Sequence, residues 1–111
     1  MKISDLILRF DLTVSAGKQG LSNDIHGGYC GDLLSDVMGK APCGCVWLTI
    51  QGHQNIVAVA VLKEMAGIVV TGGYHPSSET IQRADQEAIP LLLWPGFSFE
   101  LAGKLYQAGL L

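Results

Sequence analysis

Charge is scarce in this sequence. Charged residues make up 15% of the 111 residues, whereas a typical soluble domain has about 25%. Only seven residues are Lys or Arg, they are scattered, and the net charge is −3. Proteins that bind nucleic acids gather Lys and Arg on one face to neutralise phosphates. We therefore expect no nucleic-acid partner.

Long apolar runs are absent as well. A membrane-spanning helix needs about 18 consecutive apolar residues, and the longest run here, residues 56–62, ends at Lys63 and Glu64. The first residues lack the apolar core and the small-residue cleavage site of a signal peptide. These absences predict no membrane partner and a cytoplasmic location, in which the three cysteines are free thiols.

The common nucleotide-binding and catalytic motifs are also missing. Lys18 follows Gly17 but is not followed by the Ser or Thr of a phosphate-binding P-loop. Gly27-Gly28 lacks the third glycine of a dinucleotide-binding turn. A histidine can act as a general base near neutral pH, but no histidine here has a nucleophile at a diagnostic spacing. We expect no catalytic residues.

What the chain does have is 49% apolar residues and 14 glycines. Three apolar runs, 45–50, 68–71 and 89–93, read as buried strands. Helical segments 55–66, 77–88 and 99–108 alternate with them, with Asn55, Ser77 and Ser98 as candidate N-caps and Gly109 as the left-handed residue after the last helix. This order indicates parallel βαβ units.

The first half of the chain gives weaker signals. Helical spacing covers residues 5–11 and 32–40, and short β-prone runs cover 12–15 and 25–30. No linker or repeat divides the sequence. We therefore predict one domain, residues 1–111, of the α/β class, with a mainly parallel sheet flanked by helices.

Two polar segments follow predicted strands. In open α/β sheets, ligands bind outside the carboxyl ends of the strands, and helix N-termini there attract anions. The segments therefore form a candidate site for a small anionic ligand or a nucleotide. The alternative is that they are polar turns with capping residues. The candidate residues are Thr49, Gln51, His53, Asn55, Thr71, Gly72, Gly73 and His75.

The cysteines allow a different function. Cys43 and Cys45 lie close together, and Cys30 with His26 or His53 would complete four ligands for zinc or an iron–sulfur cluster. The spacing matches no standard ligand set, and Cys45 opens an apolar strand where cysteine behaves as a small apolar residue. We therefore expect no metal or other cofactor, and keep a metal site as the alternative.

Several segments resemble the DRTGG domain family. They are residues 28–38, 47–51, 53–60 and 68–73, of which Asp32-Leu-Leu-Ser35 and Asn55-Ile-Val-Ala-Val-Ala60 are the most specific. Thr71-Gly72-Gly73 matches part of the name-giving motif, whose Asp and Arg are absent. The resemblance covers nearly the whole chain and extends to the N-terminal domain of HPr kinase/phosphorylase.

The resemblance implies an α/β fold, dimer contacts and a regulatory or assembly role. It implies neither kinase nor pyrophosphatase activity, because the catalytic motifs of both are absent. Our main interpretation is a non-catalytic, homodimeric ligand-sensing module, with a nucleotide or small anionic metabolite and another protein as candidate partners. Some stand-alone members are hydrogenase-associated, so the alternative is a hydrogenase-related iron–sulfur or metal accessory protein that uses Cys30, Cys43 and Cys45.

Overall fold

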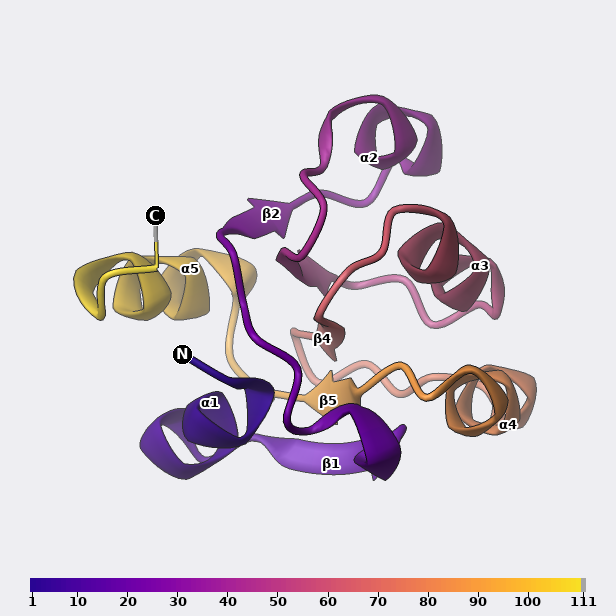
Figure 1. Ribbon diagram of the computed structural model, residues 1–111, viewed down its shortest axis with the longest axis horizontal. Helices are drawn as coiled ribbons and strands as arrows, with labels where there is room; N and C mark the ends of the chain where they lie inside the picture. Colours follow the sequence, from indigo (N-terminus) through magenta and orange to yellow (C-terminus); the bar gives the residue numbers. More distant parts are fainter. Residues whose placement is uncertain (111) are drawn as a thin grey trace.

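A computed structural model describes residues 1–110, and a five-stranded sheet forms its centre (Figure 1). The strands lie in the order β1 (Thr13–Ala16), β5 (Leu91–Leu93), β4 (Gly67–Val70), β3 (Val46–Thr49) and β2 (Gly28–Cys30). Strands β2 to β5 are mutually parallel, and β1 pairs antiparallel with β5 at one edge. The predicted mainly parallel α/β fold is therefore confirmed.

Helices cover both faces of the sheet. Helices α2 (Leu34–Lys40), α3 (Asn55–Leu62) and α4 (Ser78–Glu87) lie on one face, and α1 (Ile3–Phe10) and α5 (Ser98–Gln107) on the other (Figure 1). A short 3₁₀ turn, Lys18–Gly20, follows β1. Strands β3 and β4 are buried along their whole length. This double covering accounts for much of the scarcity of charge, because central strands with two covered faces carry apolar side chains.

Each face of the sheet contributes its own core cluster. The cluster under α2, α3 and α4 is centred on Trp47, Ile56 and Ile68. The cluster under α1 and α5 contains Ile3, Leu6 and Leu101 together with further apolar residues. Among residues 1–110, no helix is long and apolar enough to cross a membrane.

Three helix boundaries differ from the prediction. Helix α3 ends at Leu62 rather than near residue 66. Glu64 has a left-handed backbone conformation that ends the helix. The Ala66 amide then donates to the Cys45 carbonyl, next to the paired strands β3 and β4. Helix α1 begins at Ile3, where the Lys2 amide donates to Asp5. Helix α2 begins at Leu34 rather than residue 32.

Two predicted N-caps are wrong. Helix α3 has Gln54 at the N-cap position, so Asn55 is its first helical residue. Helix α5 has Phe97 at that position, and Ser98 is the first residue of the helix. The cap predicted at Ser77 is confirmed, since its hydroxyl accepts from the Thr80 amide.

Candidate functional site

The two polar segments lie side by side at the carboxyl edge of the sheet. Strands β3 and β4 are paired neighbours, with Thr49 opposite Val70. Beyond the strands, the Thr71 amide donates to the Thr49 carbonyl at 2.9 Å, and the Ser77 amide donates to the Gly52 carbonyl at 3.1 Å. The Thr80 hydroxyl donates to the same Gly52 carbonyl at 2.6 Å. The β3–α3 and β4–α4 loops therefore form one continuous rim.

Asp32 joins the β2–α2 loop to this rim. Its Oδ1 accepts from the Thr49 hydroxyl and from the Ile50 amide, both at 2.8 Å. The Gln51 side-chain amide donates to the Asp32 carbonyl at 3.2 Å. Thr49 is completely buried, and its oxygen also accepts from the Gln51 amide. Thr49 and Gln51, both candidate ligand residues, therefore hold neighbouring loops together.

Thr71 joins β4 to helix α5. Its buried hydroxyl lies 2.6 Å from the Ser98 hydroxyl, and the Gly72 amide donates to the Gly96 carbonyl at 2.7 Å. This hydroxyl contact explains why Ser98 does not cap its helix. Burial raises the pKa of the neighbouring Cys30 thiol, and a hydrogen bond with Ser98 partly opposes that rise. Cys30 is therefore a protonated thiol at neutral pH and not an activated nucleophile.

Side chains accept from backbone amides at the start of two rim helices. His53 Nδ1 accepts from the Asn55 amide at 3.1 Å at the start of α3. The Ser77 hydroxyl caps α4. Nδ1 of His53 is therefore engaged by the backbone. His75 is exposed, and its backbone packs against Gly52.

Gly72 and Gly73 give the β4–α4 loop its shape. Their φ angles are 78° and 79°, in the left-handed region that only glycine adopts without strain. A Cβ added at Gly72 would lie 3.2 Å from the Tyr74 ring, and one added at Gly73 would meet nothing within 4 Å. The tip of this loop is therefore open to a ligand.

Several large apolar side chains in the segments that follow the strands are exposed, and no sequence pattern predicted their exposure. Tyr74, Phe97 and Phe99 are 57%, 72% and 89% exposed. Leu33 and Ile50 are exposed in the two remaining loops. Their position directly after strand ends was the available signal. Large apolar side chains gathered in solvent are typical of a binding surface.

Positive side chains are missing from these loops. Residues 31–33, 50–54, 71–77 and 94–97 contain no Lys or Arg. The first turns of α4 and α5 carry Glu79 and Glu100, and hydrogen bonds with its own backbone amide and with Ser77 lower the pKa of Glu79. A compact anion would therefore find backbone amides here but no cationic side chain.

The three cysteines lie at opposite ends of the sheet. Cys30 ends β2 at the carboxyl edge, and Cys45 precedes β3 at the amino edge. Since Gly28 pairs with Val46, Cys30 and Cys45 are about 10 Å apart along the strands. Burial raises the pKa of Cys45 to about 11, and a hydrogen bond with Glu64 raises that of Cys43. Within residues 1–110, no three His, Cys, Asp or Glu side chains gather as a metal site.

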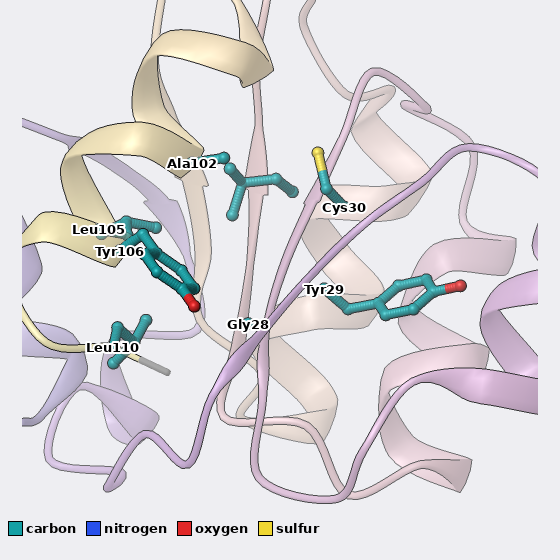
Figure 2. Close-up of a pocket in the computed structure, with 8 residues that line it drawn as sticks. Gly28, Tyr29, Cys30, Ala102, Leu105, Tyr106 and Leu110 are labelled. Atoms are coloured by element: carbon teal, nitrogen blue, oxygen red, sulfur yellow. The ribbon is translucent and has the colours of Figure 1, made fainter.

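A small apolar cavity lies away from the rim loops, between β2 and α5. Its volume is about 160 Å³. Figure 2 shows Ala102, Leu105 and Tyr106 of α5 on one side and Gly28 and Cys30 of β2 on the other. No sequence pattern predicted this cavity.

Comparisons with known proteins find a similar fold. No family model matches the sequence, and no curated protein matches it. The fold is similar to the crystal structure of the CBS and DRTGG domains of the regulatory region of Clostridium perfringens pyrophosphatase, complexed with its activator diadenosine tetraphosphate. The TM-score is 0.66 at 14% identity, over 92% of this chain and 44% of that one. The likeness supports the DRTGG-like fold that the sequence resemblance implied.

Proposed function

We propose that this chain is a non-catalytic regulatory module that binds a nucleotide at the carboxyl edge of its sheet. The observation that carries the proposal is the exposure of Tyr74, Phe97 and Phe99, which lie in the segments after β4 and β5, together with the open Gly72-Gly73 turn. The likeness to a regulatory region crystallised with diadenosine tetraphosphate supports the same ligand class. A homodimer belongs to this proposal.

A nucleotide fits this edge better than a compact anion. Aromatic side chains stack on nucleobases, and each stacked base contributes about 1–3 kcal/mol. The loops lack Lys and Arg, so phosphate groups would be bound by backbone amides such as that of Gly73. Most of the affinity would then come from the base, and would depend weakly on salt.

The polar side chains of the rim support a binding role rather than catalysis. The hydroxyls of Thr49 and Thr71 are buried and hydrogen-bonded. His53 Nδ1 accepts a backbone hydrogen bond. An activated nucleophile needs an adjacent general base or a lowered pKa, and Cys30 has a raised one.

Calorimetric titration with ATP, AMP and diadenosine tetraphosphate tests this proposal. We expect binding of at least one of them, and at least tenfold weaker binding by Tyr74→Ala, because a stacking surface is lost. Leu62→Ala is the control, since Leu62 is also exposed but lies at the far end of α3. Absence of binding at millimolar nucleotide, or equal weakening by both variants, would refute the site.

A further inference from the structure

Strand β2 is an unpaired edge of the sheet. It pairs with β3 on one side only, and among residues 1–110 no strand lies beyond it (Figure 1). The Val46 amide donates to the Gly27 carbonyl, and the Gly31 amide donates to the Leu48 carbonyl. Alternate residues of a strand bond to the same neighbour. Gly28 and Cys30 therefore direct their amides and carbonyls outward.

Strand β2 is short, but it carries no charge, proline or bulge that would prevent pairing. Natural sheet edges carry Lys, Pro or a bulge that prevents pairing with another strand. The opposite edge strand, β1, has such an irregularity between Val14 and Ala16. Residues 27–31 read Gly-Gly-Tyr-Cys-Gly, without charge or proline. The two edges of the sheet are therefore built differently.

The surface beside β2 is apolar. The cavity between β2 and α5 opens next to the strand (Figure 2). The side of α5 at this cavity carries no charge and has small residues, since Ala102 and Gly103 lie one turn before Tyr106. Lys104 lies instead over the Trp94 ring, at 5.6 Å. A molecule that pairs with β2 would cover apolar surface without burying a charge of α5.

We propose that a second copy of this chain occupies this edge, with the two β2 strands antiparallel about a twofold axis at Tyr29. The proposal rests on the homodimer of the proposed function and names its surface. In this register Gly28 of each copy lies opposite the partner subunit's Cys30, so every outward amide and carbonyl of these residues finds a partner.

The side chains of this register are complementary. Gly28 and Cys30 both face the α5 side, whereas the Tyr29 ring points to the opposite face (Figure 2). A residue without a side chain therefore meets a cysteine at each of the two symmetric positions. The charged residues nearest Tyr29 are Asp36 and Lys40, which form an ion pair at 2.9 Å. In a twofold dimer each subunit would therefore bring both signs of charge to the interface, and not one sign that repels its own copy. A closed twofold interface of this kind stops at two chains.

A cysteine substitution tests the register. Gly28→Cys is sterically tolerated, because a Cβ there meets no atom closer than 3.7 Å. It places a thiol opposite the partner subunit's Cys30, at about the 5.5 Å Cα separation that a disulfide accepts. The background carries Cys43→Ser to remove the other exposed thiol. Diamide, which accepts the two thiol hydrogens, should then link the chains.

Three measurements decide the proposal. Light scattering should give twice the chain mass of 11.8 kDa, and Gly28→Lys should halve that mass while Thr13→Lys on β1 does not. Diamide should give covalent dimers with Gly28→Cys/Cys43→Ser and not with Cys43→Ser alone, whose Cys30 thiols are two residues out of register. A monomeric wild type, a dimer unaffected by Gly28→Lys, or equal crosslinking of both cysteine variants would overturn the proposal.

These outcomes are independent of nucleotide binding. Monomeric Gly28→Lys that still binds nucleotide would leave the proposed ligand site intact. A dimer that binds no nucleotide would refute the ligand site and keep the interface. The melting temperature of each variant shows whether a change of mass reflects a lost interface or a lost fold.

Discussion

The two ends of the parallel sheet belong to the same strands but differ in how deeply their flanking residues are buried. At the amino end, the chain enters β4 and β5 through buried residues, among them Met65, Ala66, Ile89 and Pro90. At the carboxyl end, exposed Tyr74, Phe97 and Phe99 follow the strands. The polar groups of the carboxyl end hold its loops in place, while its apolar groups remain in solvent. One end is covered by packing, whereas the other leaves large apolar side chains exposed.

Glycines mark this difference most clearly. A Cβ added at Gly17, at the amino end, would lie 1.9 Å from the Ile89 carbonyl oxygen, which is backbone and cannot move aside. A Cβ added at Gly73, at the carboxyl end, would meet nothing within 4 Å. Both residues have a positive φ. The same residue type therefore serves close packing at one end and an open loop at the other.

The largest expected effect is the loss of stability in Gly17→Ala. The added methyl group collides with the backbone of Ile89, and the φ of 73° disfavours alanine. We expect a decrease in the free energy of unfolding of at least about 3 kcal/mol, measured by urea denaturation.

Two matched substitutions complete this test. Gly73→Ala has the strain of a positive φ without the collision, so it should cost about 1 kcal/mol. Gly39→Ala, in the last turn of α2 with open space around it, should stabilise the protein by up to about 1 kcal/mol. Equal losses at Gly17 and Gly73 would contradict the contrast between the two ends.

Much of this fold could be predicted from local sequence signals. Strands β3 and β4 are continuous apolar runs, and their adjacency brings the two predicted polar segments to one edge. Gly109, predicted as the left-handed residue after the last helix, has a φ of 94°, and the next amide donates to the Leu105 carbonyl. Each of these features depends on residues close in sequence or on the order of the strands.

The features that were missed depend on contacts between distant residues. Ser77 and Ser98 both precede predicted helices, yet only Ser77 caps one. Ser98 instead meets Thr71, 27 positions earlier, because α5 begins beside the loop that follows β4. No sequence pattern records that meeting, nor the exposure of Phe97 and Phe99. The fold was thus more predictable than the exposed surface at the carboxyl edge of the sheet.

The response of stability to alkaline pH is a second test of the burial at the amino end of the sheet. Burial raises the pKa of Cys45 from 9.0 to about 11. The Cys45 thiol then binds its proton more tightly in the folded state than in the unfolded state. Its contribution to the free energy of unfolding is therefore fully present below pH 9 and is lost as the pH rises toward 11. This group should contribute up to about 2 kcal/mol to that fall.

The measurement is a series of urea denaturations between pH 7 and pH 11. Above pH 9, the free energy of unfolding of Cys45→Ala should fall less steeply with pH than that of the wild type. The smaller side chain should also lower this free energy by the same amount at every pH. Cys43→Ser is the comparison: the pKa of this exposed thiol is raised chiefly by Glu64 rather than by burial, so its loss should change the pH dependence less than Cys45→Ala does. A pH dependence of Cys45→Ala that equals that of the wild type would show that Cys45 is not held in a dry environment.

The smallest expected effect is at the carboxyl end, where Thr71→Val removes the hydroxyl that meets Ser98 at 2.6 Å. A net loss of about 1 kcal/mol is expected, because valine keeps the shape but leaves the half-buried Ser98 without this partner. In Thr71→Val/Ser98→Ala both partners are gone, so the double variant should lose less than the sum of the single losses. Urea denaturation of the four proteins measures this coupling. Additive losses would mean that the contact contributes nothing, and that the position of α5 at the rim is set by its apolar packing alone.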